Sequence, residues 1–342
     1  MSAPPDLDPA ALVAVVRSAF GLDVESVTFL PAGTAHAFRA QGPGGRSFLK
    51  VMPASPYGKR VTARALAEVP LLRALRSSGV LPHVPVPLPT QDGGWVAALG
   101  GFRVFAYEWI DAVNTGDSWN RALPELAALL GRLHGASAML RREVLELPMP
   151  PEDFQLPFEA DLVAALDTLR ELPETARPAL TALRDLLLPH ADTVQHVLEL
   201  ARARSRFASS GSPALVVCHT DAHGGNVMRD PAGSLWVIDW ETARLAPPEH
   251  DLWMLGARLP ELLPAYLRGL GHSFTPDAEL LAFYVLRRPL EDIAEDLRWM
   301  LVEDTGSAQD DHALHLIRTY SLPALLGAEA DAATVALRWN EP

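Results

Sequence analysis

The sequence has little of several features that define common protein classes. Its 342 residues include a single cysteine, Cys218, so the chain cannot form an internal disulfide, and a reducing, cytoplasmic setting is expected. No stretch of about 18 uncharged apolar residues occurs, so we expect no membrane span. Residues 1–6 lack the basic and apolar regions of a secretory signal, so we expect no such signal.

Positive charge is also scarce. The chain has 29 Lys and Arg against 42 Asp and Glu, a formal net charge of −13 at pH 7. Binding to a nucleic-acid backbone needs a surface rich in Lys and Arg, so we expect no nucleic-acid partner. A cationic small molecule suits this charge better. Hydrophobic residues make up 49% of the chain, which excludes a disordered protein. Nothing in these patterns fixes an oligomeric state.

Secondary-structure signals divide the chain near residue 110. Before it, helix and strand patterns alternate, at residues 10–20, 24–30, 37–40, 47–52, 62–77, 84–88, 95–99 and 102–109. After it, helical patterns dominate, at residues 123–139, 158–171, 179–190, 193–208, 249–263 and 276–301. This change predicts an α+β protein with a sheet-containing N-terminal lobe, residues 1–110, and a larger helical lobe, residues 111–342.

The most informative segment has the pattern His-x-Asp-x4-Asn, followed 13 residues later by a second Asp. The four positions are His219, Asp221, Asn226 and Asp239. Oxygen ligands from Asn and Asp suit Mg²⁺, which takes its other ligands from water and phosphate. Phosphoryl transfer from ATP uses such a metal, together with a carboxylate that accepts the proton of the acceptor hydroxyl. The pattern therefore predicts Asp221 as catalytic base and Asn226 and Asp239 as metal ligands.

A hairpin is expected to bring the metal ligands together. Residues 230–234 read as a turn, so residues 226–229 should pair antiparallel with residues 235–239. We expect Asn226 and Asp239 to face each other at the open end, about 5 Å apart between their Cα atoms.

A nucleotide also needs a cation near its phosphates. Lys50 lies in an apolar strand, where a charge requires a partner, and Glu68 on the next helix is predicted to pair with it. The loop between the first two strands should cover the phosphates, with Gly33, Thr34, Ala35 and His36. A P-loop NTPase is excluded, because the sequence has no Gly-x4-Gly-Lys-Ser/Thr motif.

Two other classes of protein remain open. A zinc metallohydrolase would use His219, Asp221, His223 and His250 as ligands. A catalytically silent binding protein would keep both lobes without the chemistry. Against the first, His219 fits better as a buried histidine that hydrogen-bonds the loop backbone, and Cys218 fits a small core position.

Together, these motifs and the order of elements resemble the aminoglycoside phosphotransferase family, which has a protein-kinase-like fold. The resemblance covers nearly the whole chain and is greatest to the spectinomycin phosphotransferase branch. It also rests on three further segments, Leu130-Gly131-Arg132-Leu133-His134, Ile238-Asp239-Trp240-Glu241 and Ala246-Pro247-Pro248-Glu249-His250-Asp251-Leu252. It departs from the family at Thr220, where many members have Gly, and at Ala112, where a Gly often follows the hinge.

The resemblance implies a bilobal fold with a small antiparallel-sheet lobe that binds nucleotide, and ATP or GTP with Mg²⁺ as cofactors. It implies that backbone groups of Glu108 and Ile110 contact the adenine at the hinge. The acceptor would be a hydroxyl of an aminoglycoside- or aminocyclitol-like antibiotic. A choline-, homoserine- or sugar-like acceptor is the alternative.

An acidic helix face supplies candidates for binding a cationic acceptor. In the helix predicted at residues 276–301, Glu291, Asp292, Glu295 and Asp296 share one face with Trp299. This face is either ordinary solvated surface or the acceptor site, where Asp292 and Asp296 pair with an ammonium and Trp299 packs on a sugar or cation. By the resemblance, Glu241 and Asp251 would join them.

Overall fold

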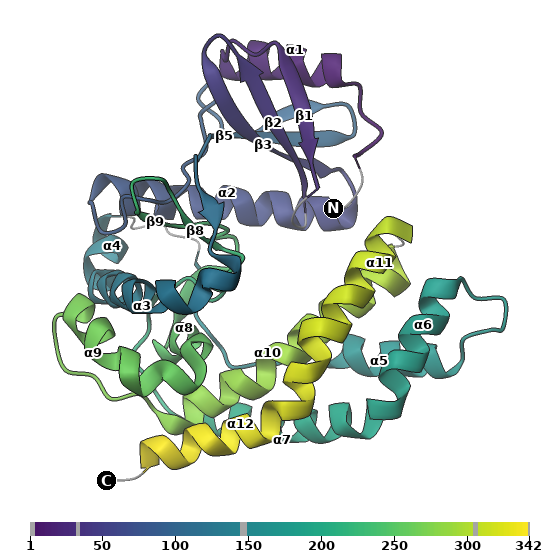
Figure 1. Ribbon diagram of the computed structural model, residues 1–342, viewed down its shortest axis with the longest axis vertical. Coiled ribbons are helices and arrows are strands. Elements are labelled where there is room, and N and C mark those ends of the chain that lie inside the picture. The colour runs from purple at the N-terminus through teal and green to yellow at the C-terminus, as the bar shows by residue number, and fades with distance from the viewer. Residues whose placement is uncertain (1–3, 32–34, 144–148, 304–306, 341–342) are drawn as a thin grey trace. The chain divides into compact units, whose positions relative to one another are not determined.

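The computed structural model describes residues 4–31, 35–143, 149–303 and 307–340 (Figure 1). The chain forms two compact units, each assembled from segments distant in sequence. The first comprises Met1–Pro150, Val216–Leu245 and Pro260–Ser273, and the second Pro151–Leu215, Ala246–Leu259 and Phe274–Pro342. The boundary predicted near residue 110 divides the sequence into two continuous lobes, whereas these two units are each discontinuous in sequence. That boundary stays a prediction. Among the described residues, no helix is both long and apolar enough to cross a membrane.

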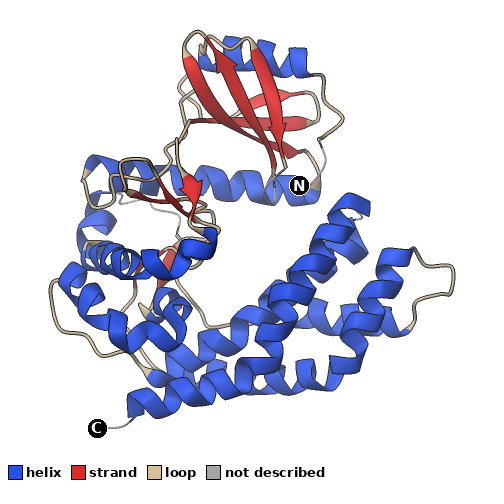
Figure 2. Cartoon of the chain, in the orientation of Figure 1, coloured by secondary structure: helices blue, strands red, loops and turns tan. Residues whose placement is uncertain are grey.

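The first unit begins with a helix and a five-stranded antiparallel sheet. The sheet has the order β1-β2-β3-β5-β4. Its strands are β1 (Ser26–Leu30), β2 (His36–Gly42), β3 (Gly45–Pro53), β4 (Ala97–Leu99) and β5 (Phe102–Glu108). Helix α1 (Pro9–Phe20) packs Leu12 and Val16 into the core beside Leu49 and Val104 of the sheet. This confirms the sheet predicted for the N-terminal region, which Figure 2 shows in red.

The ends of α1 follow the signals in the sequence. The Asp8 side chain accepts a hydrogen bond from the Ala10 backbone N–H at 2.9 Å, and Gly21 ends the helix with a φ of 68°. Helix α2 (Pro56–Ser77) starts earlier than predicted, because Ser55 caps it by accepting from the Gly58 N–H at 3.1 Å. The helix continues through Pro70.

The strand predicted at residues 84–88 is wrong. Here the described chain forms only an isolated bridge between Pro87 and Tyr107. Prolines at every second or third position remove the backbone donors that a strand requires, at Pro82, Pro85, Pro87 and Pro89.

The rest of the first unit carries the polar motifs. One small sheet has the order β6-β8-β9, formed by β6 (Val113–Asn114), β8 (Val227–Arg229) and β9 (Leu235–Val237). A second pairs β7 (Val216–Cys218) with β10 (Arg244–Ala246). Beside them lie η1 (Gly116–Ser118), α3 (Trp119–Gly135), α4 (Ser137–Glu143) and α9 (Leu259–Leu270). Helices α3 and α9 approach so closely that a Cβ on Gly131 would lie 2.1 Å from the Tyr266 carbonyl oxygen.

The second unit is helical. Its elements are α5 (Glu159–Arg170), α6 (Pro178–Leu187), η2 (Leu188–His190), α7 (Ala191–Ser210), α8 (Glu249–Leu252), η3 (Trp253–Arg258), α10 (Ala278–Arg298), η4 (Trp299–Glu303), α11 (Ser307–Leu316), η5 (Ile317–Ser321) and α12 (Leu322–Asn340). Helix α10 lies at the centre, and its predicted apolar face is buried at Leu290, Ile293, Ala294 and Leu297, as is Met300 in η4. The helices of residues 307–340 were not predicted.

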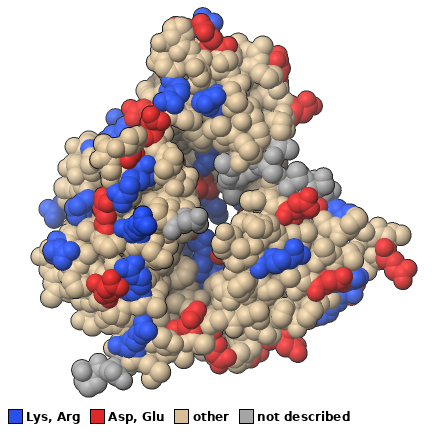
Figure 3. All heavy atoms as spheres, viewed as in Figure 1, with Lys and Arg blue, Asp and Glu red and all other residues tan. Residues whose placement is uncertain are grey.

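Charged side chains are dispersed over the face seen in Figure 3. Lys and Arg (blue) and Asp and Glu (red) are scattered there over a mostly uncharged surface. On that face, the described residues offer no continuous basic surface of the kind that binds a nucleic-acid backbone.

Candidate active site

The His-x-Asp-x4-Asn segment forms a loop between β7 and β8, anchored by residues from β6 and just after it. The Thr115 N–H donates to the Val227 carbonyl at 2.9 Å, and the Thr115 hydroxyl donates to the Gly224 carbonyl at 3.2 Å. The Asn114 amide donates to the Gly225 carbonyl. These contacts hold both glycine carbonyls, so the loop has a defined path.

His219 is the buried structural residue that the sequence predicted. Its side chain is completely buried and packs edge-on against the ring of Trp240, with 4.5 Å between centroids. Nδ1 accepts from the Asp221 N–H at 3.1 Å, so Nε2 carries the proton and donates to the Ile238 carbonyl at 2.9 Å. Because both ring nitrogens are hydrogen-bonded to backbone groups, His219 is not arranged as a zinc ligand, which disfavours the metallohydrolase.

Asn226 orients Asp221. Its Nδ2 donates to the Asp221 backbone carbonyl at 2.9 Å and to carboxylate Oδ2 at 3.1 Å. His223 Nε2 lies 3.7 Å from Oδ1 of the same carboxylate. His223 Nδ1 accepts from the Gly225 N–H at 2.9 Å, so this histidine also shapes the loop. The Asp221 carboxylate is therefore fixed by neighbours on its own loop.

The hairpin register differs from the prediction by one residue. Val227 pairs with Val237, and the Ile238 N–H donates to the Asn226 carbonyl at 2.9 Å. Asn226 therefore lies opposite Ile238, and Asp239 lies one residue beyond the predicted position.

The turn explains this register. The Asp230 N–H donates to the Ser234 carbonyl at 3.1 Å, so these two residues close the turn as a pair. Gly233, with a φ of 90°, allows the chain to reverse between them. Asp239 itself has a φ of 65°, a left-handed conformation that turns the chain away from the strand.

Lys50 is bonded to two carboxylates. Its Nζ lies 3.1 Å from Asp239 Oδ1 and 2.9 Å from Glu241 Oε2. Burial lowers the pKa of Lys50, but Asp239 and Glu241 raise it more, so the net pKa lies well above the ordinary value. Burial raises the pKa of Asp239, but the charge and hydrogen bond of Lys50 lower it by more. The net pKa therefore lies below the usual value. These shifts keep both Lys50 and Asp239 charged at neutral pH.

The predicted ion pair between Lys50 and Glu68 is not formed. Glu68 is buried, and its Oε1 accepts from the Tyr107 hydroxyl at 3.3 Å. Burial raises the pKa of Glu68 to about 8, although the nearby Lys50 charge lowers it. The carboxyl is therefore mostly neutral at pH 7 and attracts Lys50 weakly, while Asp239 and Glu241 take the lysine charge.

Thr220 takes an unusual backbone conformation beside the candidate base. Its φ is 72°, which is costly for a β-branched residue and is accessible to glycine without strain. The Thr220 hydroxyl lies 2.9 Å from the Thr242 hydroxyl and 3.2 Å from the Thr242 carbonyl. These hydrogen bonds offset part of the backbone cost.

The other predicted nucleotide residues are only partly described. Gly33 and Thr34 lie outside the described residues. Ala35 is buried, and the His36 ring at the start of β2 packs near Phe29 and Phe102. Glu108 ends β5, where its side chain pairs with Arg76 at 2.7 Å, and Ile110 follows it half-buried.

The predicted acceptor residues differ in their burial and in their ion pairs. Glu241 is bonded to Lys50 at 2.9 Å, and its role as an acceptor residue stays a prediction. Asp251 on α8 is completely buried, so it does not present a carboxylate to solvent. Trp299 is 6% exposed, because its ring packs inside rather than standing on a solvated face. Asp292 pairs with Arg288 at 2.8 Å.

Asp296 is the acid of this helix face with the most perturbed environment. Partial burial, together with the charges of Asp292 and Glu295, raises the pKa of Asp296 to about 7. Neighbouring Glu295 pairs with Arg298 at 2.5 Å. Within the described chain, Asp296 has no such cationic partner.

Sequence reasoning missed two contributions to the site. Tyr107 was not predicted as the partner of Glu68, although the sheet register offered a signal. Phe48 pairs with Tyr107 in the sheet, and Lys50 lies two residues along the same strand, so all three share one face. The anchoring of the loop by Asn114 and Thr115 had no signal, because it joins segments about 110 residues apart.

Comparison with known proteins identifies the family. A model of the phosphotransferase enzyme family matches residues 26–284, which is more than half of the chain. The chain belongs to the phosphotransferase enzyme family. This phosphotransferase is 30% identical over 271 residues to Protein StrN of Streptomyces griseus, across 76% of this chain and 77% of that protein.

Solved structures agree in fold. The phosphotransferase superposes on spectinomycin phosphotransferase in complex with ADP and spectinomycin with a TM-score of 0.72 and 19% identity, over 95% of this chain and 99% of that one. A microcompartment-associated aminopropanol kinase superposes with a TM-score of 0.62 and 16% identity, over 97% of this chain and 99% of that one. Choline kinase LicA of Streptococcus pneumoniae superposes with a TM-score of 0.55 and 18% identity, over 93% of this chain and 98% of that one. These likenesses confirm the predicted bilobal, kinase-like α+β fold.

Proposed function

We propose that this phosphotransferase uses ATP or GTP with Mg²⁺ and transfers the terminal phosphoryl group to a hydroxyl of a small molecule. One observation carries the proposal: Asn226 orients Asp221, while Lys50 is bonded to Asp239 in the same unit. In this proposal residues 1–110 bind the nucleotide, and residues 111–342 supply the catalytic loop and the acceptor site.

The residues present fit a hard divalent cation. Both hydrogen bonds of the Asn226 side chain use Nδ2, which leaves carbonyl Oδ1 available as a ligand. Asp239 uses Oδ1 for Lys50, and its side chain is 39% exposed. Asn226 and Asp239 would hold Mg²⁺, which supplies charge neutralisation of the phosphates when bound.

Asp221 supplies the chemistry at the acceptor. Its carboxylate is positioned to receive the proton of the attacking hydroxyl, as the new oxygen–phosphorus bond forms and the bond to the leaving nucleoside diphosphate breaks. The Asn226 hydrogen bond holds the carboxylate in one orientation. Lys50 keeps its proton, because its pKa is raised, and so provides a permanent positive charge for the phosphates.

For the acceptor, we propose an aminoglycoside- or aminocyclitol-like molecule with an ammonium group. Asp296 supports this choice, because it is a partly buried carboxyl without a cationic partner in the described chain. Its pKa of about 7 would fall on binding an ammonium, which favours the charged pair. A smaller amino alcohol is the second candidate, because proteins of similar fold are described as aminopropanol and choline kinases.

A panel of acceptors tests this function. Release of ADP would be measured with spectinomycin, aminopropanol, choline and the uncharged sugar glucose, each with Mg²⁺ and with EDTA. We expect Mg²⁺-dependent ADP release that needs an amine-containing acceptor. An active uncharged acceptor would overturn the proposed acceptor class. Failure of ATP and GTP to bind in the presence of Mg²⁺ would overturn the proposed function.

A further inference from the structure

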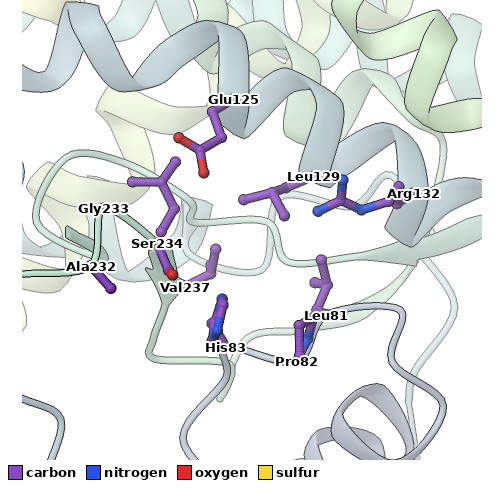
Figure 4. Close-up of a pocket in the computed structure, with 11 residues that line it drawn as sticks. Leu81, Pro82, His83, Glu125, Leu129, Arg132, Ala232, Gly233, Ser234 and Val237 are labelled. Carbon is purple, nitrogen blue, oxygen red and sulfur yellow. The ribbon is translucent and has the colours of Figure 1, made fainter. Parts of the chain in front are cut away.

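A second pocket lies in the first unit, on the far side of the hairpin. It has a volume of ≈ 330 Å³, and it is formed by the segment after α2, by α3 and by the turn and strand of the β8–β9 hairpin. Figure 4 shows that Arg132 reaches in from α3, opposite the hairpin residues. The volume is at the small end of the range for small-molecule sites, about 300–1,000 Å³.

Charges inside the pocket are not balanced. Glu125 lines it, but its carboxylate is bonded to Arg229 at 3.0 Å. Arg132 has an exposed side chain, and within the described residues its guanidinium has no ion pair or hydrogen bond. The half-buried His83 ring rests on Trp236, with 5.1 Å between centroids, and makes no hydrogen bond within the described chain. Arg132 is thus the pocket's charge without a counter-ion.

Apolar side chains supply part of the remaining lining. Leu81, Leu129, Leu235 and Val237 are all buried and line it, and Ser234 lines it as well. A guanidinium beside these apolar side chains suits a ligand with an anionic group and an apolar body.

The pocket is distinct from the candidate active site. It is lined by Gly233 and Ser234 at the closed end of the hairpin, whereas Asn226 precedes β8 and Asp239 follows β9, at the open end. At about 3.3 Å per residue, the two ends are separated by the length of the strands. None of the proposed catalytic, metal or nucleotide residues lines it.

From these observations we propose that the pocket is a second binding site, for a small organic anion. The ligand places a carboxylate or phosphate on the Arg132 guanidinium, within reach of His83 and Ser234, and packs its apolar part on Leu129 and Leu235. The site does not depend on the proposed function, since its occupancy is measured without turnover.

Calorimetric titration tests the proposal. The probes are benzoate and phenyl phosphate, which share an apolar ring and differ in the anionic group. The controls are phenol, which has the ring without the anionic group, and inorganic phosphate, which has the anion without the ring. Titrations are run with ADP in excess, so that the proposed nucleotide site is occupied. We expect saturable binding of one equivalent of at least one aromatic anion, and weaker binding of phenol and of inorganic phosphate.

Three variants locate the site. Arg132→Gln should weaken binding by about tenfold or more, because a charge-assisted hydrogen bond is lost. Arg132→Lys should retain most of the affinity, and it guards against a folding defect of the first variant. Arg121→Gln, on the same helix and exposed but outside the pocket, is the matched control and should bind like the wild type.

Several results would overturn the site. These are the absence of saturable binding by either aromatic anion, equal affinity of wild type and Arg132→Gln, and an equal loss in Arg121→Gln. Loss of binding when ADP is in excess would place the probe in the nucleotide site and would also reject the proposal.

Discussion

Lys50 and Glu241 form an ion pair with 2.9 Å between nitrogen and oxygen, although they lie 191 positions apart in the chain. The pair joins β3 of the N-terminal sheet to the segment that follows β9, and Asp239 bonds the same ammonium at 3.1 Å. The lysine that we propose for phosphate binding is therefore positioned by the segment that carries a proposed metal ligand.

Loss of the Glu241 charge should destabilise the fold more than loss of the Glu68 carboxyl at pH 7. Glu241→Gln removes one of two anions from a largely buried ammonium and should lower the free energy of unfolding by about 1–3 kcal/mol. Glu68→Gln replaces a group that is mostly neutral at this pH and should cost less. Urea denaturation of both variants measures the difference. A greater loss in Glu68→Gln would show that Glu68 is the anionic partner of Lys50.

Glu68 should also make stability depend on pH. Its pKa is raised from 4.5 in the unfolded chain to about 8 in the fold, so the folded state holds the proton more tightly. The stabilisation is fully present below pH 4.5 and is lost as the pH rises through 8. The unfolding free energy of Glu68→Gln relative to wild type should therefore rise between pH 5 and 8 and level off above 8. A difference that does not change over this range would contradict the assignment.

Asp221→Asn should separate chemistry from nucleotide binding. The amide keeps the shape of the side chain but cannot accept the hydroxyl proton, so kcat should fall by about 10²–10⁴-fold. The Kd for Mg·ATP should change little, because Asp221 is bonded to Asn226 rather than to Lys50. Steady-state kinetics and nucleotide titration give the two values. A near-normal kcat would show that Asp221 is not the base.

Asp239→Ala should abolish turnover, because it removes a proposed metal ligand together with a Lys50 partner. Raising the Mg²⁺ concentration should recover little activity, since Asn226 alone offers one protein oxygen. Activity measured against Mg²⁺ concentration in both proteins checks this. Equal Mg²⁺ dependence of variant and wild type would remove Asp239 from the metal site.

Acceptor binding should depend on Asp296. Asp296→Asn should raise the acceptor KM and leave the KM for ATP nearly unchanged. Asp292→Asn should do the same to a smaller extent, because Asp292 is already bonded to Arg288. Glu295→Gln on the same helix, whose carboxylate is bonded to Arg298, is the matched control. If acceptor KM is the same in wild type and both Asp variants, this face is ordinary surface.

The sequence predicted much of the fold through local signals. The cap at Asp8 and Pro9 placed the start of α1, and apolar periodicity placed the buried face of α10. The strand at residues 84–88 failed because periodicity does not register the donors that alternating prolines remove. Helices of residues 307–340 were missed, because they pack as part of the second unit and show weak amphipathic patterns.

Within the site, the spacing of the motif predicted which residues come together better than it predicted which residues pair with one another. The motif correctly singled out Asp221, Asn226 and Asp239 as residues of one loop and hairpin, but the register was off by one because the turn closes on Asp230 and Ser234. The partner of Lys50 was not predictable from spacing alone. In the structure Lys50 is bonded to Asp239 and Glu241, which lie about 190 positions away in the chain, so no local signal points to them.

Phosphorus NMR of the reaction mixture tests the proposed phosphoryl transfer most directly. The protein is incubated with ATP, Mg²⁺ and spectinomycin or another acceptor that supports ADP release, and the products are recorded. We predict a new phosphomonoester signal that grows in step with ADP and is lost in Asp221→Asn. Formation of ADP and inorganic phosphate alone, with no phosphorylated acceptor in any reaction, would contradict it.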